Sequence, residues 1–323
     1  MENQKRSKKI SSKVFYFAFG ALTVLTLFIN TGISKFAEPG TNNFITDSTV
    51  NIRITSPEIP SELYFAGEKV PLNNFEVRER VDRELLVNTY WFSSTILGMK
   101  RANRWFPVII PILKKYNVPE DFKYLALIES NLSNTTSYAG AVGFWQFTEE
   151  PAKKYGLEIN DEVDERYNVE KSTEAACKYL LDAYSELKSW TLAAASYNMG
   201  LNGIVKLMQK EKANGYYNLL LSDETSRYVA RMLAMKIIFS DPNKYGYYLK
   251  PGDLYPPLRT TNVKIDSSVD NWADYAISHG INYKTLKYYN PWLRDISLEN
   301  KKNETYILKL PVNSEDGIVP NNN

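Results

Sequence analysis

Glu129 ends an otherwise apolar helix face. Within residues 119–130, Phe122, Leu125 and Ala126 occupy the i, i+3 and i+4 positions of that face, and Glu129 follows at i+7. A carboxyl group held against apolar neighbours loses hydration, which raises its pKa and keeps it protonated near neutral pH. The spacing therefore predicts a general acid. The alternative is a carboxylate in the last helical turn that points out into water.

A glycine-containing segment follows, and it ends in side chains that can contact a ligand. Residues 137–146 read Ser-Tyr-Ala-Gly-Ala-Val-Gly-Phe-Trp-Gln. Gly143 can adopt a positive φ and lets the backbone approach another segment closely. Trp145 and Gln146 supply a stacking face and an amide. No Lys-Ser or Lys-Thr follows, so this is not a phosphate-binding loop, and ordinary turn formation is the alternative.

Two later helices carry further polar groups. Tyr197 and Asn198 follow three alanines, which indicate close helix packing, and Gly200 ends that helix. Tyr228 lies in the first turns of a helix that Ser222 caps.

The rest of the composition excludes several kinds of chemistry. Cys177 and His279 are the single cysteine and histidine of the 323 residues, so neither an internal disulfide nor a Cys/His zinc cluster can form. A Ser-His-Asp triad is disfavoured on the same ground. We expect no metal and no organic cofactor. The formal net charge of +2 gives no electrostatic basis for a nucleic-acid partner.

Helical periodicity begins near residue 75 and indicates a mainly α domain over residues 75–250. It predicts helices over residues 119–130, 169–187, 191–200 and 223–239, with Asn117 capping the first of them. Pro107 and Pro111 are expected to break the preceding helical stretch. Residues 34–74, rich in Thr, Asn, Ser and Pro, are expected to form a linker.

The N-terminus has the pattern of an export signal. Five cations precede an apolar run over residues 14–29, an arrangement typical of export with the basic end inside. The run is shorter than a membrane span of about 20 residues and longer than a signal-peptide core of roughly 7–15 residues. Residues 1–33 are therefore a cleaved signal, or an anchor that holds the chain to the membrane through residues 14–33. Either way we expect a periplasmic protein of the cell envelope.

The C-terminal part is a separate small module. After the rigid connector Tyr255-Pro256-Pro257, residues 262–265 and 305–310 are expected to be strands, and residues 269–279 and 283–289 helices. This predicts a β-α-α-β unit over residues 258–312. The polar tail, residues 313–323, is expected to be disordered.

Taken together, Glu129-Ser130, Gly143-Phe144-Trp145-Gln146, Ser196-Tyr197-Asn198 and Tyr228 resemble the soluble lytic transglycosylase catalytic domain, in particular the membrane-bound murein transglycosylase D group. Many relatives have Gly-Leu-Met-Gln and Ala-Tyr-Asn in the second and third motifs, but the polar residues stay in register. The resemblance implies a goose-type lysozyme-like fold with Glu129 as acid and base. It also implies a sugar-binding cleft, with substrate-binding positions at Ser137, Gly143 and Trp145. Five further residues would line this cleft or orient Glu129: Ser130, Gln146, Tyr197, Asn198 and Tyr228.

The number of carboxylates distinguishes between reactions. Glycosidases that retain or invert configuration use two, about 5–5.5 Å or about 6.5–9.5 Å apart, yet residues 130–148 contain neither Asp nor Glu. The resemblance implies instead that Glu129 alone cleaves the peptidoglycan bond between N-acetylmuramic acid and N-acetylglucosamine, leaving a 1,6-anhydro end. A hydrolytic lysozyme-like muramidase and a non-catalytic peptidoglycan-binding protein remain as alternatives.

The C-terminal module resembles a LysM domain. The resemblance is carried by Trp272, Asn290-Pro291-Trp292-Leu293 and the final Leu310-Pro311. It implies a partner containing N-acetylglucosamine, that is, peptidoglycan glycan strands. A module that only packs against the catalytic domain is the alternative.

Overall fold

The computed structural model describes residues 54–312. The N-terminal apolar run, most of the predicted linker and the tail after residue 312 lie outside these residues. None of the helices between residues 54 and 312 combines the length and the apolar character that crossing a bilayer requires.

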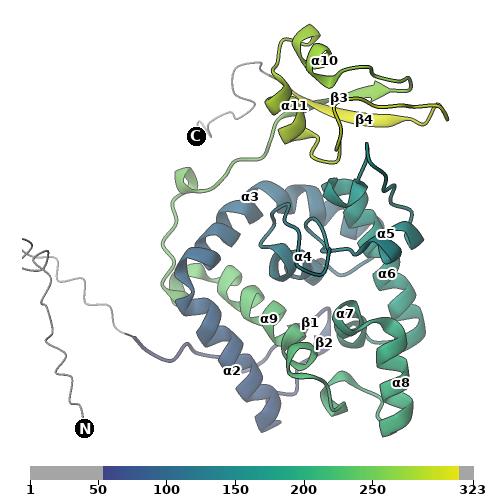
Figure 1. Cartoon of the computed structure of the whole chain (residues 1–323). Coiled ribbons are helices and arrows are strands. Elements are labelled where there is room, and N and C mark those ends of the chain that lie inside the picture. Colours follow the sequence, from purple (N-terminus) through teal and green to yellow (C-terminus); the bar gives the residue numbers. More distant parts are fainter. Residues whose placement is uncertain (1–53, 313–323) are drawn as a thin grey trace, which may run out of the picture. The chain divides into compact units, whose positions relative to one another are not determined.

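The described part of the chain is mainly α, as predicted, with ten α-helices and two small antiparallel sheets (Figure 1). In chain order the elements are β1 (Tyr64–Phe65), β2 (Glu68–Lys69), α2 (Phe75–Tyr90), α3 (Phe92–Lys115), η1 (Glu120–Phe122), α4 (Lys123–Ser130), α5 (Glu149–Lys154), η2 (Glu165–Tyr167), α6 (Val169–Leu187), α7 (Trp190–Met199), α8 (Leu201–Glu211), η3 (Tyr216–Asn218), α9 (Asp223–Ser240), η4 (Pro242–Tyr245), η5 (Pro251–Asp253), β3 (Thr260–Ile265), α10 (Trp272–Ser278), α11 (Tyr283–Tyr289) and β4 (Tyr306–Pro311).

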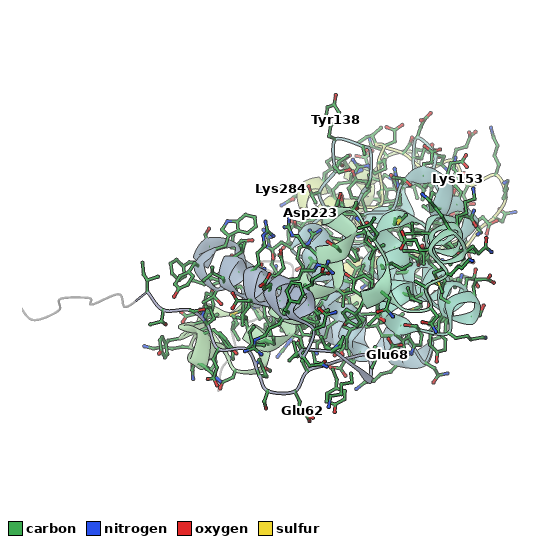
Figure 2. The ribbon with its side chains drawn as sticks, turned by 90° about the horizontal axis from the view of Figure 1, so that it is seen from below. Glu62, Glu68, Tyr138, Lys153, Asp223 and Lys284 are labelled. Atoms are coloured by element: carbon green, nitrogen blue, oxygen red, sulfur yellow. The ribbon has the colours of Figure 1, made fainter. Side chains whose placement is uncertain are left out.

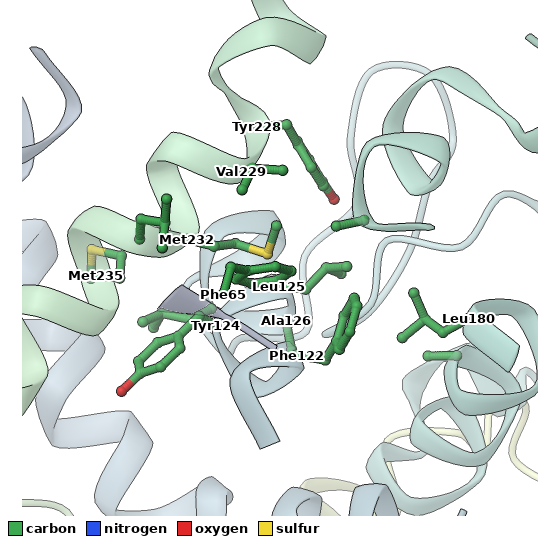
Figure 3. Close-up of a cluster of buried hydrophobic side chains, with 14 of the residues drawn as sticks. Phe65, Phe122, Tyr124, Leu125, Ala126, Leu180, Tyr228, Val229, Met232 and Met235 are labelled. Atoms are coloured by element: carbon green, nitrogen blue, oxygen red, sulfur yellow. The ribbon is translucent and has the colours of Figure 1, made fainter. Parts of the chain in front are cut away.

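Helix α4 packs against α3 and α9 and lies at the centre of the helical domain (Figure 1). Leu125 and Ala126 on its apolar face are fully buried, as is Phe122 at the end of the preceding turn η1. Figure 3 shows this face meeting Val229 and Met232 of α9. Burying an aromatic side chain such as Phe122 removes about 150–250 Å² from water, which stabilises the packing of this segment in the core. The last turn of α4 is therefore held at a fixed position in the domain.

Side-chain caps define where the surrounding helices begin. Asn168, Ser189 and Ser222 each accept a hydrogen bond from a backbone N–H in the first turn of α6, α7 and α9, respectively. Each cap satisfies a donor that has no partner within the helix. The predicted cap at Ser222 is thus confirmed, as are the predicted helices at residues 169–187 and 223–239 to within one residue.

Two predictions near α3 are wrong. The helix runs through Pro107 and Pro111 without ending, because its other face buries Ala102, Ile109 and Leu113 in the core, and this burial offsets the hydrogen bonds that proline removes. Asn117 does not cap the next helix. It has a positive φ of 56° and ends α3, where the following N–H, that of Val118, donates to the carbonyl of Leu113.

The predicted linker is also wrong at its C-terminal end. Residues 64–69 form the β1–β2 hairpin, and Phe65 is fully buried with its ring 5.4 Å from that of Phe122 (Figure 3). Strands of two residues are too short to give an alternating pattern. The helical domain therefore includes residues before residue 75.

The C-terminal module has the predicted β-α-α-β order. Strands β3 and β4 pair antiparallel, from Thr260 opposite Pro311 to Ile265 opposite Tyr306. Helices α10 and α11 pack together, and Trp272, Leu286 and Leu308 form a core with no exposed surface.

Candidate active site

Glu129 lies in the last turn of α4 and is partly buried. Burial raises the pKa of its carboxyl group above the ordinary value. A hydrogen bond from Tyr228 and the positive charge of Arg231 oppose this effect, and the negative charge of Glu224 reinforces it. The net effect is a carboxyl whose pKa is raised mainly by burial.

Two tyrosines accompany this carboxyl, Tyr228 buried and Tyr197 partly buried. Tyr228, from the second turn of α9, donates its Oη–H to Oε1 of Glu129. Tyr197, from α7, donates to the carbonyl of Trp145 at 2.8 Å. Burial first, and the charge of Glu129 second, raise the pKa of both phenols well above the ordinary value. Both tyrosines are thus neutral donors at any physiological pH.

Helix α4 ends at Ser130, and the chain then turns sharply. Ser130 is buried and donates to the carbonyl of Phe144 at 2.9 Å. Asn131 takes the left-handed conformation that ends α4, and Arg101 of α3 donates to its carbonyl at 3.0 Å. Ser130 therefore ties the acid-bearing helix to the segment 135–147, which we call the site loop.

The site loop is held by its own hydrogen bonds. Gln146 has a φ of 50°, and its Nε2 donates to the carbonyls of Gly143 at 2.8 Å and Thr135 at 3.1 Å. Ser137 Oγ accepts from the N–H of Ala141 at 3.0 Å, so it closes a turn. The neighbouring Tyr138 projects from the end of the loop and is fully exposed (Figure 2).

Gly143 has the positive φ that the sequence predicts, at 79°. A Cβ at this position would lie 2.1 Å from the carbonyl oxygen of Arg166. Only glycine fits here, because any larger residue would collide with backbone as well as being strained.

The prediction that Trp145 offers a stacking face to a sugar is wrong. Its side chain has no exposed surface, and its indole N–H donates to Thr173 Oγ1 on α6 at 2.9 Å. Trp145 anchors the site loop to α6 instead. The sequence could not reveal this, since the direction of a loop side chain depends on a partner 28 residues away.

Asn198 lies at the end of α7 beside the first turn of α9. Its Nδ2 donates to Glu224 at 3.1 Å, and its Oδ1 accepts from Thr225 at 2.8 Å. The sequence interpretation missed Glu224, an exposed residue two positions after the cap Ser222. An acidic residue in a first helical turn is usually explained by the helix dipole alone.

The acidic residues after the site loop mostly have other partners. Glu149 pairs with Lys153, Asp164 with Arg166, and Glu165 with Lys171. Within residues 54–312, no three Asp, Glu, His or Cys side chains are grouped closely enough to hold a metal ion.

A cavity of about 410 Å³ lies elsewhere, lined by α3, the connector and the C-terminal module. Ser133, Asn134 and Phe144 form part of its wall, but Glu129 does not. Aromatic and aliphatic side chains make up most of its lining. The candidate acid Glu129 therefore lies outside this cavity.

These features define the class: a helical domain whose central helix ends in a desolvated carboxyl, followed by a small β-α-α-β module. Residues 107–220 match the family described as the transglycosylase SLT domain, and residues 261–314 match the soluble lytic transglycosylase C-terminal LysM-like domain. The chain therefore carries a lysozyme-like SLT domain and a LysM-like domain, as the motifs predicted.

Curated proteins are similar to this chain over a longer stretch. The membrane-bound lytic murein transglycosylase D of Escherichia coli K12 is 28% identical over 243 residues, which cover 72% of this chain and 52% of that protein. The E. coli O6:H1 protein of the same name gives the same values. A putative tributyltin chloride resistance protein of Alteromonas is 28% identical over 144 residues, 43% of this chain and 70% of that protein. The chain thus spans about half the length of the transglycosylases that it matches.

Proposed function

We propose that this protein is a peptidoglycan lytic transglycosylase with Glu129 as its single catalytic acid and base. The observation that carries the proposal is the position of Glu129 at the end of α4, where burial raises its pKa and Tyr228 donates to its carboxyl oxygen. The match of residues 107–220 to the SLT domain and the similarity to the murein transglycosylases support the same reaction.

In the proposed reaction the Glu129 carboxyl gives its proton to the oxygen that joins C1 of N-acetylmuramic acid to N-acetylglucosamine. The C1–O bond breaks, and N-acetylglucosamine leaves with a free hydroxyl. The ionised carboxylate, stabilised by the Tyr228 hydrogen bond, then takes the proton of the muramic acid C6 hydroxyl while O6 attacks C1. The product has a 1,6-anhydro ring, and Glu129 is protonated again without water.

Hydrolysis is the second candidate, and Glu224 favours it. Its charge acts on Glu129, and it is exposed in the first turn of α9. A carboxylate near the acid is what an inverting or retaining glycosidase needs. In that mechanism Glu224 would activate water or attack C1, and the product would have a reducing end.

Mass spectrometry of murein sacculi digested by the protein distinguishes the two. We expect anhydromuropeptides from the wild type and from Glu224→Gln. Glu129→Gln should lose about 10²–10⁴-fold in turnover, the range for one general acid–base group, and keep its fold. Products with predominantly reducing ends, together with loss of activity in Glu224→Gln, would replace the transglycosylase by a hydrolase.

The sequence also supports a location in the cell envelope, with residues 1–33 directing export and residues 14–33 holding the chain to the membrane if they are not cleaved. N-terminal sequencing of the mature protein tests whether residues 1–33 are cleaved, and extraction of membranes at high pH tests whether residues 14–33 hold the chain to the membrane.

The LysM-like module supports peptidoglycan strands as the partner. Sedimentation of full-length Glu129→Gln with sacculi measures that binding without turnover.

A further inference from the structure

A hairpin of residues 158–165 belongs to both modules. It comes from the helical domain and is closed by a bridge between Ile159 and Asp164. Its Val163 has no exposed surface and packs in the core of the C-terminal module, with Trp272 and Leu293. A residue of the helical domain thus completes the small core of the C-terminal module. A module tethered only by a flexible linker would have a core made of its own residues.

Backbone hydrogen bonds continue this contact as in a β-ladder. Val163 and Leu293 form an antiparallel bridge. The N–H of Asp164 donates to the carbonyl of Trp292 at 2.9 Å, and the N–H of Arg294 donates to the carbonyl of Glu162 at 2.7 Å. Backbone pairing fixes both the register and the direction of the two segments. The module is therefore docked on the hairpin in one orientation.

The same hairpin leads directly to the site loop. Arg166 forms a buried bidentate pair with Asp164, at 2.9 Å from Nε to Oδ1 and 2.7 Å from Nη2 to Oδ2. Its remaining nitrogen, Nη1, donates to the carbonyls of Gly140 at 3.2 Å and Phe147 at 3.3 Å. A fork held by a carboxylate has one orientation, so Arg166 spans the loop that Ser130 ties to the catalytic helix.

We propose that Arg166 is a positioning residue for the site loop, and that the docked module holds Asp164 and Arg166 in place. The LysM-like module is then a structural part of the catalytic unit, in addition to any glycan that it binds. The inference deepens the proposed function, on which its kinetic part rests. Undocking the module should lower kcat on a short glycan by about tenfold or more, because a loop displaced by about 1 Å misaligns the substrate. KM should change little.

The test is Val163→Asp in the full-length chain, which places a charge in the shared core. Ile277→Asp is the matched control, because Ile277 is on the module and 69% exposed. Amide hydrogen exchange without substrate reports docking at Asp164 and Arg294, whose N–H groups cross the interface. Amides of α9 report whether the helical domain stays folded. We expect faster exchange at the interface in Val163→Asp alone.

The decisive readout is the site loop, whose Val142, Gly143 and Gln146 amides are all hydrogen-bonded. We expect these amides to exchange about tenfold faster or more once the module undocks, and to keep wild-type rates in the control. Undocking with an unchanged loop and an unchanged kcat would overturn the proposal.

Arg166→Lys tests the positioning residue by itself. It keeps the charge and the docking hairpin but cannot form the fork, so we expect faster loop exchange with a docked module. Wild-type loop exchange in this variant would reject the role of Arg166. Because exchange is measured without substrate, this result is independent of whether the products have anhydro or reducing ends.

Discussion

Tyr228 donates a hydrogen bond to Oε1 of Glu129, joining the second turn of α9 to the last turn of α4. Burial and the neighbouring carboxylate keep the phenol neutral, so it always acts as the donor. The bond favours the ionised form of Glu129, whereas burial favours the protonated form. The two opposing effects suit the proposed reaction, in which Glu129 first gives and then takes a proton.

Glu129→Gln should change how stability depends on pH. Because burial raises the pKa of Glu129, the folded protein keeps a proton that the unfolded chain has already lost. Wild-type stability from this group is full below the ordinary carboxyl pKa and falls as pH rises through the raised pKa, whereas the variant has no such fall. Urea unfolding from about pH 4 to about pH 8 measures it. A constant difference between the two proteins would contradict the raised pKa.

Tyr228→Phe should move the alkaline limb of the pH–activity profile to higher pH. It removes an interaction that lowers the pKa of Glu129, so the acid stays protonated further into the alkaline range. The ionised carboxylate also loses a donor, and a hydrogen bond to a charged group is worth about 1.5–3 kcal/mol, so kcat should fall about tenfold or more. The measurement is kcat/KM against pH on a soluble glycan.

Tyr197→Phe is the control for that profile. Its hydroxyl donates to the Trp145 carbonyl rather than to Glu129, so we expect the limb to stay near its wild-type position. An alkaline limb that moves to lower pH in Tyr228→Phe would mean that the tyrosine stabilises the protonated acid instead.

Local signals explain which parts of the fold were predictable. The helix at residues 169–187 was predicted with its observed bounds, because Asn168 caps it and a strong apolar face follows. The hairpin at residues 64–69 was not, since its position is set by Phe65 packing on Phe122, far along the chain. Helix α8 was also missed; Ile204 is its one fully buried residue, and its other apolar residues are only partly buried against the core.

In the candidate site, too, only the features with a local sequence signal were predictable. The helical face ending in Glu129 could be read from spacing, but its pairing with Tyr228, 99 residues away, could be inferred only from the resemblance. Charged residues whose contacts lie far along the chain, such as Arg166 with Gly140 and Glu224 with Asn198, have no local signature. Trp145 was misassigned because composition reveals an aromatic ring but not which way it faces.

Trp145→Phe should destabilise the protein without a selective loss of sugar binding. The variant leaves Thr173 without its indole partner and opens a small cavity, so we expect a loss of about 2–4 kcal/mol in the free energy of unfolding. Urea denaturation measures this loss, and KM on a short glycan should change by less than about threefold at a temperature where the variant is folded. A large rise in KM with unchanged stability would restore a direct role in binding.

Glu68 binds the N-terminal end of α7, the helix whose C-terminal end carries Tyr197 and Asn198. Its carboxylate accepts hydrogen bonds from the N–H groups of Trp190 and Thr191 at the start of α7, and from the hydroxyls of Ser189 and Thr191. A negative charge at a helix N-terminus is stabilising. Glu68→Ala leaves these donors without their partner, so we expect a loss of about 2–3 kcal/mol in the free energy of unfolding.

Glu62→Ala is the matched control, since Glu62 lies just before the same hairpin (Figure 2) and its carboxylate is exposed, with only Lys69 as an ion-pair partner. Because exposed ion pairs are screened by solvent and contribute little to stability, Glu62→Ala should be close to wild type in urea denaturation. Because α7 also places Tyr197 beside the site loop, Glu68→Ala should lower kcat as well, which Glu62→Ala should not. Equal effects of the two substitutions would mean that the hairpin contributes only general charge and does not anchor the helix.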